Sequence, residues 1–213
     1  MKIVAIVPIK SISKRVKGKN FKRIGKKPLY KHLLDKLDKA NFDEIYLDSD
    51  SKQIQKYSIR KSYKFINRLP RLAKDNANGN DLLVYHSKLI KADIYFQLFV
   101  TSPLLSVKTI NSCIKKLKNS KNKDSILTVK KIFTWFWFKN KPVNYNPVVL
   151  PRSQDAQPII QETTGLYGIK RTALIKRKCR IGFKPIFYEI PSSESVDLDT
   201  IEDFDYIKKY IKN

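Results

Sequence analysis

Residues 2–20 read KIVAIVPIKSISKRVKGKN, an apolar run that passes directly into a basic loop. The first part, Lys2–Ile9, is mostly Val, Ile and Ala, a pattern typical of a parallel strand covered on both faces. The second part, Lys10–Asn20, holds five cations, two hydroxyl side chains and one glycine. The stretch therefore predicts a buried first strand, rather than a signal peptide, followed by a basic loop.

Segments of alternating type follow this start. Leu33, Leu34 and Leu37 recur at helical spacing and predict a helix over 29–40, and the stretch 44–47 predicts the next strand. Two further helices are expected from their apolar faces: one at 81–90, with Leu82, Leu89 and Ile90, and one after Pro103, with Ile110, Cys113, Ile114 and Leu117. The other expected elements are strands at 92–100, 125–129, 165–169 and 185–190 and a closing helix at 201–211. This alternation predicts an α/β fold with a mostly parallel central sheet flanked by helices, whose ligands bind beyond the carboxyl ends of the strands. We expect residues 1–213 to form a single domain.

The composition of the chain indicates which kinds of partner and which compartment to expect. The formal net charge is +25, a balance that favours a polyanionic partner. The lysines are spread over the whole chain instead of forming one basic arm, so we expect a dispersed basic surface and no nucleic-acid partner. No apolar run is long enough to span a membrane. Cys113 and Cys179 match no metal or redox spacing, which is typical of a reducing, cytoplasmic compartment.

A segment rich in aromatic residues interrupts the alternation. Residues 132–151 are rich in aromatics, prolines and asparagines, with Trp135, Phe136, Trp137 and Phe138 in a row. Such a segment can leave the main sheet, at about 132–160, and present alternate rings to a second subunit. The same rings can equally close the core beneath a long loop.

Two segments contain residues that suit phosphate and metal chemistry. The loop Lys10–Asn20 follows the first parallel strand, where nucleotide phosphates commonly bind, but it has neither P-loop nor dinucleotide-binding spacing. A solvated basic turn fits the loop as well. Asp197 and Asp199 stand at i and i+2 of an extended segment, so both carboxylates can face one Mg²⁺ ion, although a helix cap or an acidic turn also explains them. Of the two histidines, His86 falls on an apolar helix face and is expected in the core.

The chain carries a series of short motifs in a fixed order. They are Val7-Pro8-Ile9-Lys10 through Ser13-Lys14-Arg15 to Gly18-Lys19-Asn20, then Pro28-Leu29, Leu47-Asp48-Ser49-Asp50-Ser51, Arg68 with Leu72-Ala73-Lys74-Asp75 and Asp81, Thr101-Ser102-Pro103-Leu104, Arg152-Ser153-Gln154-Asp155, Glu162-Thr163-Thr164-Gly165-Leu166-Tyr167, and Val196-Asp197-Leu198-Asp199-Thr200 with Asp203-Phe204. Together they resemble, over nearly the whole chain, the cytidylyltransferases that make CMP-activated acidic sugars. That family includes acylneuraminate cytidylyltransferases (CMP-sialic acid synthetases) and CMP-Kdo synthetases.

The resemblance implies a glycosyltransferase-A-like nucleotidyltransferase fold, a homodimer with its dimerisation arm at about 132–160, and a set of site residues. By position, the triphosphate would be held by Lys10, Ser13, Lys14, Arg15 and Lys19. Asn20 would contact the cytidine, Arg68 and the turn at Asn78 and Gly79 would bind the base, and Asp197 and Asp199 would hold Mg²⁺. The sugar acid would be bound by Phe99, Thr101, Ser102, Gln154, Glu162 and Tyr167. Lys19, Arg15 and Asp199 would take part in catalysis.

Departures from the family pattern fall in the loop and near the sugar. Lys10 replaces an arginine and loses its bidentate fork, and Ser11 and Ile12 replace two glycines. Phe99 and Leu105 replace a glutamine and an arginine that lie near the sugar pocket in the family. The expected partners are CTP and an acidic 2-keto-3-deoxy sugar, with release of pyrophosphate. The alternatives are a catalytically weakened protein of this fold that binds nucleic acid or another polyanion, and the same fold acting on another nucleotide or sugar.

Overall fold

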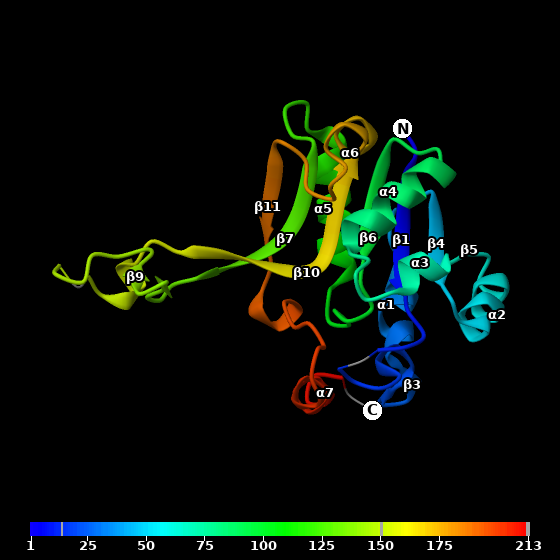
Figure 1. Ribbon diagram of the computed structural model, residues 1–213, viewed down its shortest axis with the longest axis horizontal. Helices are drawn as coiled ribbons and strands as arrows, with labels where there is room; N and C mark the ends of the chain where they lie inside the picture. The colour runs from blue at the N-terminus through cyan, green and yellow to red at the C-terminus, as the bar shows by residue number, and fades with distance from the viewer. Residues whose placement is uncertain (14, 150, 212–213) are drawn as a thin grey trace.

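The core of the protein is a seven-stranded sheet (Figure 1). The computed structural model describes residues 1–13, 15–149 and 151–211. In spatial order the sheet strands are β11 (Pro185–Glu189), β7 (Ser125–Ile132), β10 (Ile159–Lys170), β6 (Ile94–Leu98), β1 (Ile3–Ile9), β4 (Glu44–Ser49) and β5 (Lys64–Asn67). Every neighbouring pair is parallel except the two that involve β10, which runs antiparallel to β6 and β7. The predicted mostly parallel sheet is confirmed.

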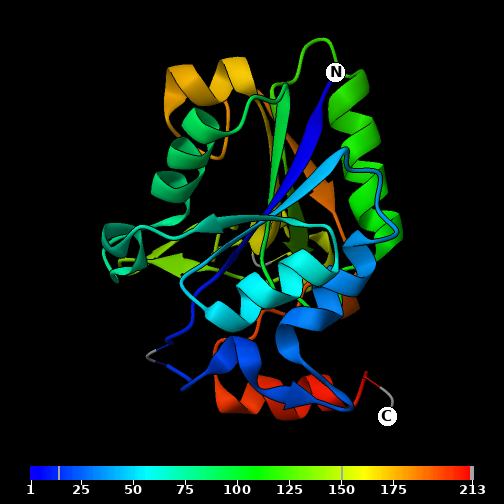
Figure 2. The same ribbon diagram turned by 90° about the vertical axis from the view of Figure 1, so that its right-hand side faces the viewer.

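Helices cover both faces of this sheet, as Figure 2 shows from the side. The helices of the described chain are α1 (Leu29–Leu37), α2 (Lys52–Arg60), α3 (Pro70–Ala73), α4 (Gly79–Leu89), α5 (Val107–Asn119), α6 (Arg171–Arg177) and α7 (Ile201–Lys208), of which α7 packs against the basic loop and not on the sheet. Alternate residues of β1 explain its continuous apolar run. Ile3, Ala5, Val7 and Ile9 pack in the cluster that includes α1, α2 and α5, whereas Val4 and Ile6 pack in the cluster that includes α4 and α6.

Several expected elements differ in extent or in the face they bury. Helix α4 begins at Gly79, because Asn78 and Asp81 form a capping box there. Leu89 is 55% exposed and does not belong to its apolar face, while Leu83 is fully buried. The helices α2 and α6 and the strand β5 were not predicted. Strand β10 is longer than the predicted 165–169 and carries an irregularity between Glu162 and Tyr167.

A third apolar cluster joins the basic loop to the C-terminal helix. Val16, from the loop, is buried with Leu198 and Phe204. The short strands β2 (Arg23–Ile24) and β3 (Lys27–Pro28) lie between the loop and α1, and Ile24 belongs to the same cluster. This packing brings the basic loop and helix α7 together on one side of the molecule, whereas the N-terminus lies at the opposite side (Figure 1).

The aromatic segment projects from the body as a long arm (Figure 1). Strands β7 and β10 pair as far as Ile132 and Ile159, and β8 (Trp137–Phe138) and β9 (Lys141–Pro142) form a small hairpin beyond them. The rings pack on one another: the centroids of Trp135 and Tyr145 are 4.6 Å apart. The alternative in which these aromatics close the main core is wrong, since none of them belongs to a core cluster.

Asp48, at the carboxyl end of β4, is the centre of a buried polar cluster. Its Oδ2 lies 2.9 Å from Nη2 of Arg68 and 3.2 Å from Nε2 of His86, and all three side chains are at most 3% exposed. The expected core histidine is therefore found, beside a carboxylate. Burial alone would raise the pKa of Asp48, but hydrogen bonds and charge from His86 and Arg68 outweigh it and hold the pKa below its usual value.

We predict that Asp48→Asn lowers the free energy of unfolding by about 3–5 kcal/mol, because it leaves the buried Arg68 charge without its counterion. Urea unfolding at pH 7 measures this loss. Because the pKa of Asp48 is depressed in the folded state, its contribution is fully present above the unfolded value of about 3.9 and is lost as the pH falls through the folded value. The control is Asp50→Asn, an exposed carboxylate two residues further on, which should change stability by at most about 1 kcal/mol. Equal losses in both variants would contradict the prediction.

Candidate active site

A hollow of about 600 Å³ lies beyond the carboxyl ends of β1, β5 and β6. Parallel α/β sheets commonly bind ligands at this edge. Ten of the residues expected in the site line it, namely Lys10, Ser13, Arg15, Lys19, Asn20, Arg68, Asn78, Gly79, Phe99 and Thr101. The structure thus brings the basic loop, the Arg68 segment and the end of β6 around one cavity, whereas Lys14 lies outside the described residues.

Hydrogen bonds hold both ends of the basic loop. Asn20 donates from Nδ2 to the carbonyl oxygen of Lys10 at 2.8 Å, which closes the loop on itself. The backbone N–H of Ser11 donates to Asp50 at 2.7 Å, and Lys10 Nζ lies 3.0 Å from Asp75. Ser11 therefore uses its side chain and backbone to anchor the loop at a position where the family has glycine.

The far end of the loop is tied to the C-terminal segment by Asp199. Lys19, only 8% exposed, places Nζ 3.0 Å from Asp199 Oδ1 and also donates to the carbonyl oxygen of Leu198 at 2.6 Å. Arg15 pairs with the other oxygen of Asp199. Burial raises the pKa of Asp199, but the hydrogen bond and charge of Lys19, together with Arg15, outweigh it and hold the pKa below its usual value. Asp199 is ionised at neutral pH.

Asp197 has one oxygen with a partner and one without. Its Oδ2 accepts a hydrogen bond from Thr164 Oγ1 at 2.7 Å, whereas Oδ1 is buried and has no hydrogen-bond partner among the described residues. Thr164 has a φ of 54°, which a β-branched residue rarely adopts, and it lies within the irregularity of β10. The irregular backbone thus turns Thr164 toward Asp197.

These two carboxylates fit a hard cation. An unpaired, buried carboxylate oxygen is an uncompensated acceptor that a metal ion would satisfy. Among the described residues no group of three or more His, Cys, Asp or Glu is placed to hold a metal. Mg²⁺ is commonly held by one or two carboxylates, with waters and substrate phosphates completing its shell, so Asp197 and Asp199 match that ion.

The residues expected to bind the sugar gather around Tyr167. Its hydroxyl donates to Glu162 Oε2 at 2.7 Å, and its ring meets Phe99 edge-to-face with centroids 6.4 Å apart. Burial, and then the hydrogen bond to Glu162, raise the pKa of Tyr167, so the phenol stays protonated. Ser102 is 1% exposed, with its hydroxyl unpaired among the described residues.

Thr101 contributes through its backbone as well. Its carbonyl oxygen accepts from the N–H of Leu198 at 2.8 Å and so joins the end of β6 to the segment that carries Asp197 and Asp199. Gln154 is the exception among the expected sugar ligands. It is exposed, stands in the segment between β9 and β10, and does not line the hollow.

Sequence reasoning missed one cation of this site, Arg180. Its guanidinium carbon lies 3.7 Å from the ring centroid of Tyr167 and 5.8 Å from that of Phe99. The residue stands in a short loop after α6, and no motif marks it. The anchoring carboxylates Asp50 and Asp75 were also not assigned, because their partners in the basic loop are distant in sequence.

The sequence was compared with known proteins. N-acylneuraminate cytidylyltransferase A of Danio rerio is 25% identical over 207 residues, which cover 92% of this chain and 48% of that protein. The CMP-N,N'-diacetyllegionaminic acid synthase of Legionella pneumophila is 25% identical over 232 residues, covering 100% of this chain and 97% of that one. The chain thus spans about half the length of some curated relatives and nearly all of another.

The fold was compared with solved structures. A CMP:2-keto-3-deoxy-manno-octonic acid synthetase, solved in complex with CTP, superposes with a TM-score of 0.71 at 16% identity and covers 99% of this chain and 98% of that one. The expected nucleotidyltransferase fold is confirmed. Residues 4–212 match the family described as cytidylyltransferase. The resemblance seen in the sequence motifs is therefore correct, and the chain belongs to the cytidylyltransferase family of nucleotidyltransferase enzymes.

Proposed function

We propose that this protein transfers CMP from CTP to an acidic 2-keto-3-deoxy sugar and releases pyrophosphate. The observation that carries the proposal is that Arg15 and Lys19, which line the hollow beyond the carboxyl ends of the sheet, both pair with Asp199. Cations on one segment and metal-type carboxylates on another are what binding of a metal–triphosphate requires.

In this proposal the loop holds the triphosphate. Lys10, Arg15 and Lys19 line the hollow and neutralise phosphate charge, while the base rests near Arg68 and the turn at Gly79. Asp197 and Asp199 would hold Mg²⁺, whose charge would assist departure of pyrophosphate. The buried Asp48 fixes the guanidinium of Arg68, so this wall of the cavity is rigid before nucleotide binds.

The reaction follows from this arrangement. The anomeric hydroxyl oxygen of the sugar attacks the α-phosphorus in line and loses its proton to solvent, a new P–O bond forms, and the bond from the α-phosphorus to the bridging oxygen of pyrophosphate breaks. Phosphoryl-type transfer depends mainly on alignment and charge neutralisation, which the loop cations supply. Asp199 is a weak base because its pKa is lowered, so we assign it charge pairing and metal binding rather than abstraction of the hydroxyl proton.

The acceptor is proposed from the names of relatives and from the site. Relatives are named for N-acylneuraminate and for N,N'-diacetyllegionaminic acid, both acidic sugars. Phe99 and Thr101 line the hollow and offer an aromatic face and a hydroxyl, a combination suited to a polyhydroxylated ligand with apolar faces. Both cysteines are free, which fits a cytoplasmic enzyme.

We also propose that the protein is a homodimer joined through the arm. Trp137 and Phe138 are 58% and 67% exposed at the β8–β9 hairpin, and exposed aromatics of this kind are enriched at subunit interfaces. An arm that reaches a neighbouring subunit would carry Gln154 toward that subunit's hollow.

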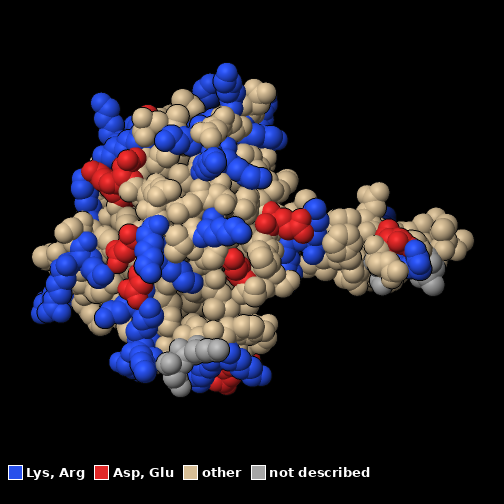
Figure 3. Space-filling model, turned by 180° about the vertical axis from the view of Figure 1, so that it is seen from behind, with Lys and Arg blue, Asp and Glu red and all other residues tan. Residues whose placement is uncertain are grey.

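Nucleic-acid binding is a weaker alternative. On the face in Figure 3, Lys and Arg side chains lie among acidic and uncharged residues over the body and form no single basic track. Many lysines are also paired with carboxylates, as in the contacts of Glu44 with Lys2 and Lys64. A dispersed charge of this kind gives a polyanion no defined path.

We predict that the protein releases pyrophosphate from CTP only when Mg²⁺ and an acidic sugar are both present. The assay uses CTP with a panel of sialic, legionaminic, pseudaminic and Kdo-type acids, and ATP, GTP and UTP serve as nucleotide controls. At least one acid should support turnover with CTP. Absence of turnover with every acid, together with tight and salt-sensitive binding of RNA or DNA, would overturn the proposal in favour of a polyanion-binding protein.

Asp199→Asn should reduce metal-dependent turnover about 100-fold or more, since it removes a charged ligand and loosens Lys19 and Arg15. The fold should persist, because the Asp199 side chain is 38% exposed. Initial rates across a Mg²⁺ titration and a thermal melt measure both effects. The matched control is Asp205→Asn, an exposed carboxylate on α7 paired with Lys208. Wild-type activity in the Asp199 variant would remove this residue from the metal site.

The double variant Trp137→Ser and Phe138→Ser should be a monomer with an unchanged melting temperature, since both side chains are exposed and lie outside the core. Sedimentation velocity over a concentration series gives the mass of the particle. The control is Ile59→Ser, which also removes an exposed apolar side chain, 73% exposed on α2, but lies outside the arm. This variant should stay dimeric. A wild-type monomer, or a dimeric double variant, would refute the role of the arm.

A further inference from the structure

The loop from Lys178 to Lys184, between α6 and β11, is held in one conformation by hydrogen bonds from its backbone. The N–H of Phe183 donates to Asp124 at 2.8 Å. The N–H of Arg180 donates to the side-chain oxygen of Asn80, at the start of α4, at 2.9 Å. This second bond joins the loop directly to the element whose first turn lines the nucleotide cavity. Arg180 is therefore presented by a fixed backbone.

The guanidinium of Arg180 is held in place by three neighbours, Tyr167, Phe99 and Gly79. It stacks over the ring of Tyr167 at 3.7 Å, with Phe99 on a second side at 5.8 Å. On a third side it meets backbone: a Cβ atom added at Gly79 would lie only 2.7 Å from Arg180 Nη1. Planar stacking on an aromatic face leaves the edge of the guanidinium, with its N–H donors, available to a ligand.

Arg180 differs from the other arginines of the site in having no counterion. Arg15 pairs with Asp199, and Arg68 pairs with Asp48. In the ranges that the structure describes, no carboxylate lies within ion-pair distance of Arg180, and nearby Glu162 accepts from the hydroxyl of Tyr167. A half-buried guanidinium without a counterion attracts an anion, because an ion pair there is screened less than at the surface.

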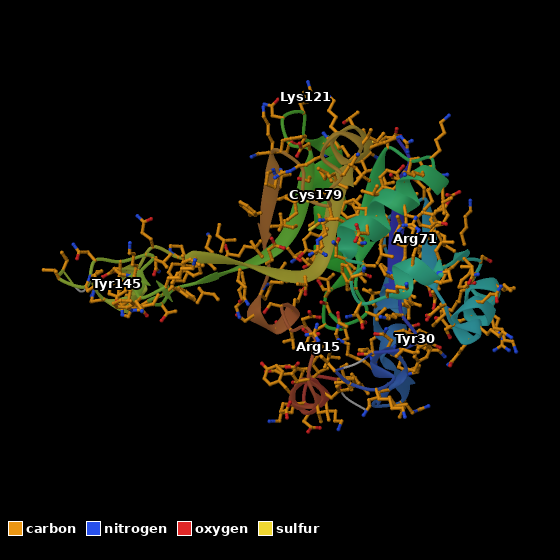
Figure 4. All side chains as sticks on the ribbon, in the orientation of Figure 1. Arg15, Tyr30, Arg71, Lys121, Tyr145 and Cys179 are labelled. Carbon is orange, nitrogen blue, oxygen red and sulfur yellow. The ribbon has the colours of Figure 1, made fainter. Side chains whose placement is uncertain are left out.

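The anion that Arg180 would bind is separate from the triphosphate. Gly79 and Phe99, which contact Arg180, line the cavity, so its guanidinium lies against the wall of that cavity. Figure 4 labels Arg15 beside α7, where it pairs with Asp199, whereas Arg180 lies over Tyr167 of β10. The cations of the site therefore fall into two groups, one on the basic loop and one at Arg180.

We propose that Arg180 is a specificity-determining residue that binds the carboxylate of the sugar acid through the edge of its guanidinium. A planar guanidinium matches a carboxylate with two parallel N–H···O bonds, which gives the site orientation as well as charge. Phe99 cannot donate, and Leu105 is fully buried in the core, so neither position supplies a polar contact of its own. The inference rests on the proposed function, since it names the residue that distinguishes an acidic acceptor from a neutral one.

Kinetics of Arg180→Met test this assignment, because methionine keeps the length of the side chain without its charge. Loss of a charge-assisted pair should raise KM for the best acid of the panel about 10- to 100-fold while KM for CTP changes less than about twofold. Arg180→Lys should recover part of the loss. Arg177→Met is the matched control: its guanidinium also lies over an aromatic ring, that of Phe183, at 5.1 Å, and both KM values should stay at wild-type levels.

Equilibrium binding separates this inference from the proposed function. Titration calorimetry with each panel acid and its methyl ester, in the presence of a non-hydrolysable CTP analogue, needs no turnover. The wild type should bind one acid about 10-fold or more tightly than its neutral ester, and Arg180→Met should bind the two equally. That result supports the assignment even where the wild type is inactive. Equal acid binding by wild type and variant, a loss confined to the nucleotide, or no acid binding by the wild type would each overturn it.

Discussion

The ion pairs that Asp199 forms with Lys19 and Arg15 connect the basic loop after β1 to the segment before α7, and the rest of the site depends on this connection. The partners are separated by 180 and 184 residues, so the loop after β1 has a defined position only when the C-terminal segment is in place. The apolar cluster of Val16, Leu198 and Phe204 stabilises the same contact between the loop and the C-terminal segment. Charge pairing alone would be weak at a half-exposed carboxylate, and the buried apolar neighbours give it a fixed geometry.

The same ion pairs explain how the site can be stable before substrate binds and still attract a triphosphate. Without nucleotide, Asp199 balances two cations that would otherwise repel each other at close range. A triphosphate would bring more negative charge than one carboxylate, so Lys19 and Arg15 would gain a stronger partner. In this exchange Asp199 would be freed to hold a metal ion together with Asp197, whose Oδ1 has no partner among the described residues. The exchange keeps the local charge near balance in both states.

Elements with a strong local sequence pattern could be predicted from the sequence, whereas contacts between residues remote in sequence could not. Strand β1 and helix α5 carry strong local patterns, and the expected sheet and most phosphate-side residues came from such patterns and from motif order. Helix α2 has only three apolar side chains among its nine residues, Ile54, Tyr57 and Ile59, so its apolar signal in the sequence is short. Leu89 fits the helical period but lies at the exposed end of α4. Asp50 and Arg180 act through partners remote in sequence, so only the folded chain shows them.

The cations lie in two groups, the basic loop and Arg180, and this separation would affect how the enzyme discriminates among acceptor sugars. Binding a triphosphate and a sugar acid side by side brings two anions together, and their repulsion has to be offset separately at each end. The basic loop would do this at one end with several cations, Lys10, Arg15 and Lys19, each of which already pairs with a carboxylate. At the other end Arg180 is single, lies over Tyr167 and has its backbone held by Asn80, so it would accept an anion in only one orientation. Several cations suit the large charge of a triphosphate, and a single fixed cation suits an acceptor that must be chosen from similar molecules.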